Sequence, residues 1–121
     1  MANFNADQRQ NIAQEYKLVV NMAPATLRSW LKTPESRSVG MTDKGKKVTQ
    51  PQEHGAVGHE MGRRILSLQE KKAGDLDDDD YAAMRKVIGY VHRHLKQRPD
   101  GDVTDTRWRK SLMNWGHDPL Q

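Results

Sequence analysis

Four basic side chains between positions 85 and 96 have the spacing best suited to a chemical task. They are Arg85, Lys86, Arg93 and Lys96. On a helical wheel that starts at Tyr81 and advances about 100° per residue, they fall between about 40° and 140°, beside an apolar arc at about 280° to 360°. Such a stripe is typical of a nucleic-acid-binding surface. A solvated polar face on a long helix would give the same pattern, so both interpretations stay open at this point.

Further basic residues extend this pattern beyond the stripe. The predicted last helix carries three of them around Trp108, and a loop and the predicted third helix add five more. These are Arg107, Arg109 and Lys110, followed by Lys44, Lys46, Lys47, Arg63 and Arg64.

Acidic residues mark the start of the helix that carries the stripe, because residues 75–80 contain five Asp and no base. A helix-turn-helix protein brings the N-terminus of its second helix into the major groove. Here that end would carry Asp77, Asp78, Asp79 and Asp80 towards phosphates, and like charges repel. We therefore expect contact through the middle and C-terminal part of the helix.

The segment GMTDKGKK at 40–47 imitates a phosphate-binding P-loop. That motif needs a hydroxyl at its last position, a buried strand before it and a helix after it. Lys47 replaces the hydroxyl and Pro51 follows, so the sequence predicts a flexible basic loop.

The spacing of Asp75, Asp77 and Asp79 imitates the opening of a calcium loop. That loop also needs Gly at its sixth position and Glu at its twelfth. Asp80 and Lys86 occupy those positions, so we predict helix capping and no metal site.

The histidines give no recognisable metal-ligand spacing. His59 and His117 lie beside glycines and could share a polar pocket, and Glu60 could orient the ring of His59. Adjacent helical residues diverge, however, and no nucleophile-elbow context is present. The sequence predicts no catalytic residues, no metal and no cofactor; an enzyme using these three residues ranks third among the hypotheses.

Hydrophobic periodicity predicts an all-α protein of about five helices, which must position these groups. The first helix is expected over about 7–20, with Asn5 or Asp7 as its N-cap. The second starts at Pro24 and ends before Pro34. Residues 35–56 have no apolar period and are expected to form a long mobile loop.

The last three helices are expected to form the main core. The third starts near Val57 and stops at Gly74, the fourth spans about 81–97 with Asp77 as its cap, and Thr104 caps the fifth. We expect the apolar stripes of the third and fourth to pack together. They consist of Val57, Met61, Ile65 and Leu68 on one helix and Tyr81, Met84, Ile88, Val91 and Leu95 on the other.

Composition sets the class of protein. The 121 residues fit one domain, residues 1–121, and the absence of Cys excludes a disulfide scaffold. The net charge is +4, from 20 Lys and Arg against 16 Asp and Glu, a modest bias towards polyanions. The first twenty residues include charged side chains and no run reaches the 18 or so apolar residues of a membrane span. We expect a soluble cytoplasmic protein.

Four segments resemble one family over nearly the whole chain from about Tyr16. They are LRSWLKTPES (27–36), VGHEMGRRI (57–65), MRKVIGYV (84–91) and LMNWGHDP (112–119). The sequence is similar to the bacterial and fungal domain-of-unknown-function family numbered 3140. Some members carry the label DNA-binding protein, which implies a cytoplasmic or nucleoid-associated protein. The resemblance supplies no catalytic residues.

The functional hypothesis is a non-enzymatic protein that binds nucleic acid, with duplex DNA expected, mainly through phosphates and with little sequence specificity. The stripe would make the main contacts, and Arg107, Arg109 and Lys110 secondary ones. The alternative is a helical protein–protein adaptor that anchors its partner through Trp108 or Leu66.

Overall fold

The computed structural model describes residues 4–39 and 57–121, and within these ranges it contains helices and no strands. The chain is a single all-α domain, which confirms the predicted fold class. Its elements are α1 (Ala6–Val19), α2 (Pro24–Leu31), α3 (Pro34–Arg37), α4 (Val57–Gln69), the 3-10 turn η1 (Ala73–Asp75), α5 (Asp78–Leu95) and α6 (Arg107–Asn114).

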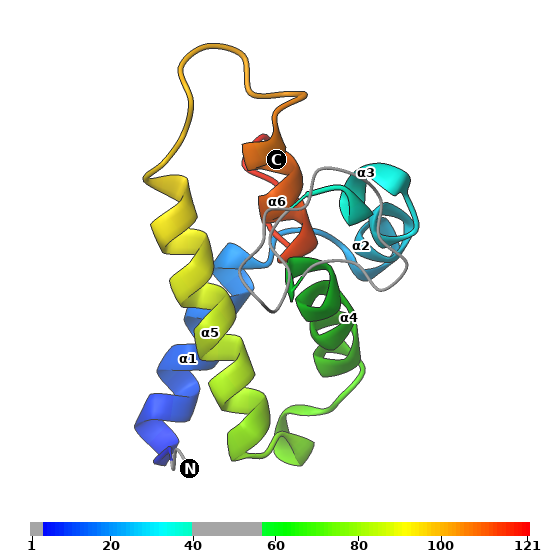
Figure 1. Cartoon of the computed structure of the whole chain (residues 1–121). Helices are drawn as coiled ribbons and strands as arrows, with labels where there is room; N and C mark the ends of the chain where they lie inside the picture. The colour runs from blue at the N-terminus through cyan, green and yellow to red at the C-terminus, as the bar shows by residue number, and fades with distance from the viewer. Residues whose placement is uncertain (1–3, 40–56) are drawn as a thin grey trace.

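Helices α1 and α5 lie side by side and run in the same direction, and the remaining helices gather beside them (Figure 1). The N-terminal end of α1 meets the start of α5, where the backbone N–H of Phe4 reaches Asp78 Oδ1 at 3.5 Å. Further along, Glu15 of α1 lies 3.1 Å from His92 of α5. The two helices therefore stay in contact over most of their length.

This arrangement corrects the expected partner of α5. The main neighbour of α5 is α1, whereas α4 packs chiefly against α2 and touches α5 much less. The apolar stripe of α1, formed by Ile12, Tyr16 and Val19, is buried and provides the surface that α5 covers. The side chain of Val57 lies outside the described residues, so its predicted contact stays a prediction.

The core combines residues from all the long helices. Ile88 of α5 is buried, as predicted, and Ile65 and Leu112 are fully enclosed. The last three helices supply most of this core, but α1 and α2 also contribute, with Leu27 of α2 fully buried.

Two helices begin with a capping box, in which the cap and the third helical residue bond reciprocally. Asn5 Oδ1 accepts from the backbone N–H of Gln8 at 2.8 Å, and Gln8 Oε1 accepts from the N–H of Asn5 at 2.9 Å. Asp77 and Asp80 form the second box at the start of α5. Both Asn5 and Asp77 are caps named from the sequence.

The predicted cap of α6 is wrong. The cap is Thr106, whose side chain accepts from the backbone N–H of Arg109. Thr104 instead donates through its backbone and its hydroxyl to Asp102 Oδ1, which keeps it in the preceding turn.

Three other boundaries differ from expectation. Pro34 does not simply end α2: it starts α3, because Thr33 caps this short helix and proline suits its first position. Helix α4 ends at Gln69, well before Gly74. Helix α5 ends at Leu95, ahead of Pro99. The loop predicted at 35–56 is wrong for its first residues, because 35–37 belong to α3 and both Ser36 and Val39 are buried. The expectation for 40–56 lies outside the described residues.

A buried carboxylate joins α4 to the start of α5. Asp80 is 1% exposed, and its oxygens accept from Arg64 Nη2 and Lys71 Nζ at 2.8 Å each. Burial disfavours the charged form, yet the hydrogen bonds from Lys71 and the Asp77 backbone and the nearby cations hold the pKa of Asp80 below its usual value. These two ion pairs hold the first turn of α5 against Arg64 of α4 and against Lys71.

Candidate functional site

Three of the stripe residues lie on the exposed face of α5, and the fourth, Lys96, is the C-cap residue of this helix. Arg85, Lys86, Arg93 and Lys96 are all exposed. Tyr81, Val87, Ile88 and the other buried residues of α5 lie on the opposite side, so the helix rather than a loop holds the stripe in place. Among the residues that the structure describes, no carboxylate forms an ion pair with any of the four.

Helix α1 forms one border of this face. Glu15 Oε1 lies 3.1 Å from Nε2 of His92, and both side chains are half exposed. His92, placed at the edge of the stripe by the helical wheel, is thus engaged by the neighbouring helix. The contact is an ion pair only when His92 is protonated.

Most of the acids at the start of α5 are occupied. Asp77 caps the helix and Asp80 is buried, while Asp78 accepts from Arg9 Nη2 at 2.7 Å. The guanidinium of Arg9 also lies 5.0 Å above the ring of Tyr81. Asp79 is exposed, so negative charge persists at this end and the positive region begins at Arg85.

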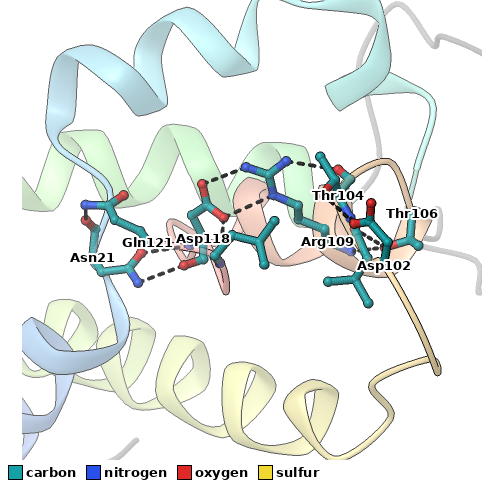
Figure 2. A network of polar contacts seen from close by, with 9 residues as sticks. Asn21, Asp102, Thr104, Thr106, Arg109, Asp118 and Gln121 are labelled. Atoms are coloured by element: carbon teal, nitrogen blue, oxygen red, sulfur yellow. Dashed lines mark hydrogen bonds and ion pairs between the residues drawn. The ribbon is translucent and has the colours of Figure 1, made fainter.

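The cations of α6 are held differently from those of α5. Arg109 makes a two-point contact with Asp118, Nε to Oδ1 at 3.1 Å and Nη2 to Oδ2 at 3.0 Å, and Nη1 donates to the Thr104 carbonyl at 2.9 Å (Figure 2). The hydrogen bond that Arg109 donates to Asp118 raises the pKa of Arg109. Lys110 pairs with Asp105 at 2.9 Å, and Arg107 Nη1 donates to the Ser38 carbonyl at 2.9 Å. All three predicted secondary contacts thus have intramolecular partners.

Figure 2 also shows what the Arg109 contact holds in place. Asp118 donates its backbone N–H to Asn21 Oδ1 at 2.7 Å, and Asn21 Nδ2 donates to the Asp118 carbonyl at 2.9 Å. Gln121 reaches the Asn21 carbonyl at 2.6 Å. The network fastens the C-terminal segment to the connection between α1 and α2, which is a structural role for Arg109.

The two histidines that the sequence suggested as partners contact different parts of the backbone. His59 is buried with Nε2 2.8 Å from the Leu31 carbonyl, and His117 Nδ1 lies 2.6 Å from the Val19 carbonyl. Glu60 pairs with Arg63 at 3.4 Å. Within the described ranges, no group of three or more His, Cys, Asp or Glu could hold a metal ion.

A buried polar cluster around Asn114 went unnoticed in the sequence. Asn114 Oδ1 accepts from Trp30 Nε1 at 2.7 Å and from Ser36 Oγ at 2.5 Å, and its Nδ2 donates to the Ser36 carbonyl at 2.8 Å. Thr33 Oγ1 in turn accepts from the Ser36 backbone N–H. Two of the four segments that carry the family resemblance, 27–36 and 112–119, meet at this cluster. Their shared resemblance was the one sequence feature that pointed to these residues.

The proposed adaptor anchors are not free surface residues. Trp108 is 7% exposed and donates Nε1 to the His94 carbonyl at 2.7 Å. Leu66 is partly buried and packs against the core. Trp108 is therefore a core residue, and the adaptor hypothesis loses its principal anchor. Leu18 of α1, 77% exposed, stands as a large apolar side chain on the surface of the described chain.

The basic segment at 40–47, with Lys44, Lys46 and Lys47, lies outside the described residues. None of the described helices has the length and apolar character needed to cross a membrane.

Fold and site together define a small all-α protein whose longest described helix carries exposed cations that pair with no carboxylate of the described residues. The family model described as "Protein of unknown function (DUF3140)" matches residues 15–113, and the chain belongs to this family. No curated protein and no solved structure matches the chain.

Proposed function

We propose that this protein binds duplex DNA through the cationic face of α5, formed by Arg85, Lys86, Arg93 and Lys96. The contacts are made to phosphates, which position the duplex without reading its bases. The observation that carries the proposal is the exposure of these four cations on one rigid face, with no carboxylate paired to them in the described chain.

The contrast with the cations that hold the helices together supports this assignment. Arg9, Arg64, Lys71 and Arg109 each form an ion pair within the protein. An ion pair with a phosphate would be gained by the stripe residues without breaking an internal one. The α6 cations would have to give up their present partners, so we assign them no part in binding.

The charge distribution along α5 sets how the duplex lies. Asp79 at the first turn is exposed and repels phosphates, whereas the interval from Arg85 to Lys96 spans about 16 Å at about 1.5 Å per residue. We infer that the duplex contacts the C-terminal two thirds of α5. A protein that binds chromosomal DNA in this way would work in the cytoplasm, associated with the nucleoid.

A salt titration tests the proposal directly. If each of the four residues neutralises one phosphate, log affinity falls with log salt at a slope of about −3.6, from about −0.9 per phosphate. Affinity should vary little among duplexes of different sequence, because no side chain reads base edges. A gel shift or fluorescence anisotropy series at several salt concentrations measures both quantities.

Charge reversal tests whether DNA binding depends on the position of the stripe residues or only on the net charge of the protein. Arg93→Glu with Lys96→Glu should reduce the slope to about −1.8, since two phosphate contacts are lost. The matched control is Lys32→Glu with Lys72→Glu, which changes net charge by the same amount at exposed positions on other elements. Equal weakening by both pairs, or unchanged binding by the first pair at low salt, would refute the assignment to α5. The adaptor hypothesis would then stand as the alternative.

A further inference from the structure

Gly89 occupies the middle of the cationic face. On the wheel that starts at Tyr81 it falls at about 80°, inside the arc of about 40° to 140° that holds the four stripe residues. It is four residues after Arg85 and four before Arg93, so these two side chains lie on the same face, one turn away on either side.

The fold gives no reason for glycine at this position. Positive φ angles among the described glycines occur only at Gly101 and Gly116, so Gly89 has an ordinary helical backbone that any residue adopts. A glycine inside a helix costs stability relative to alanine. A glycine inside a helix can have a reason in packing or in function.

Packing does not supply that reason. At Gly62, a Cβ atom would stand 2.6 Å from the carbonyl oxygen of Asn114 and 2.7 Å from Leu31 Cδ2, so close helix packing requires glycine there. At Gly89, the nearest atom to a Cβ would be Arg93 Nη1 at 3.0 Å, the far end of a flexible side chain. Alanine at position 89 could be accommodated by a small movement of that guanidinium.

The contact between Arg93 and Gly89 shows what the absence of a side chain at position 89 permits. Arg93 folds back so that its guanidinium lies against the bare backbone of α5, with Cζ 3.8 Å from the position a Cβ would take. An anion that pairs with the guanidinium in this position therefore lies close to the helix, beyond the guanidinium and not against the backbone itself.

We propose that Gly89 is the point of closest approach: it lets the guanidinium of Arg93 lie against α5, and one phosphate of the duplex pairs with that guanidinium there. This inference rests on the proposed DNA-binding function and adds to it the position at which the phosphate backbone crosses the helix. A side chain at position 89 would hold the phosphate away and displace the guanidinium, so the four cations alone are insufficient for full affinity.

The test compares Gly89→Ala with Gly74→Ala in the full chain, using a short mixed-sequence duplex at fixed low salt. Gly74 is exposed and a Cβ there meets nothing within 4 Å, so it controls for the glycine-to-alanine change away from the stripe. Gly89→Ala should raise the urea midpoint of unfolding, because alanine favours helix. It should nevertheless weaken binding by about tenfold, the loss of one charge-assisted hydrogen bond. Gly74→Ala should bind as the original does.

The outcomes separate the closest-approach inference from the proposed DNA-binding function. If Gly89→Ala binds as tightly as the original while Arg93→Glu with Lys96→Glu loses binding, the closest-approach inference is overturned and the DNA-binding function stands. If the original protein fails to bind the duplex at low salt, the function is overturned and the inference with it. A Gly89→Ala protein that binds the duplex more weakly and unfolds at a higher urea concentration supports both the function and the inference.

Discussion

Replacing Asn114 with Ala should be among the most destabilising single changes in the protein. Its side chain is fully buried and makes three hydrogen bonds, two as acceptor and one as donor, with Trp30 and Ser36. The substitution leaves buried polar groups on both partners unsatisfied, at about 1–3 kcal/mol for each such group. We expect a total loss of about 3–5 kcal/mol, which is large beside the 5–15 kcal/mol or so that typically stabilises a domain.

Urea unfolding followed by far-UV circular dichroism measures this loss, and it avoids relying on Trp30 fluorescence, which the substitution itself would alter. Asn11→Ala on the exposed face of α1 is the matched control and should change stability by no more than about 0.5 kcal/mol. Ser36→Ala should cost less, and the double variant should cost less than the sum, because the two residues share one network. A loss below about 1 kcal/mol for Asn114→Ala, or strict additivity, would refute the reasoning.

Three further outcomes follow from the fold. Ile88→Ala should lower the free energy of unfolding by about 2–5 kcal/mol in the same urea assay, because the side chain is 7% exposed in the core. Gly116→Ala should lower the thermal midpoint, since φ is 78° and a Cβ would stand 3.0 Å from Val20 Cγ1. The lowered pKa of Asp80 means that its ionised form stabilises the fold above about pH 4, the ordinary carboxyl value, and that this contribution is lost as pH falls through the folded pKa. Asp80→Asn should therefore lower the midpoint at pH 7 and flatten its decline below pH 4.

Local signals in the sequence were sufficient for the five expected helices and for the exposure of the stripe residues, but not for α3. The period of the apolar residues in α5 placed Ile88 inside and Arg93 outside, because both follow from one helical repeat. Asp77 was identifiable as a cap since its partner is only three residues away. Thr104 and Thr106 both precede the last helix, and their local patterns do not distinguish a turn from a cap.

The helix that covers each apolar face could not be predicted from local signals in the sequence. Periodicity indicates that a helix has a buried side but not which helix covers it, so the contact of α5 with α1 was missed. The role of Arg109 depends on Asp118. The role of Asn114 depends on Trp30, which lies 84 residues before it in the chain. Side chains that look like an extension of a basic surface can thus be committed to internal contacts.

The pairing of α1 with α5 also has a kinetic consequence. Phe4 and Asp78 are 74 residues apart in the chain, and Asn21 and Asp118 are 97 apart. Helical proteins usually fold fast because their contacts are local, whereas closing such long loops costs entropy before any contact repays it. We expect this protein to fold more slowly than an up-and-down bundle of equal length. During synthesis, α1 would remain without its cover until α5 has emerged from the ribosome, and the contacts of Asn21 would form only after residues 118–121 have emerged.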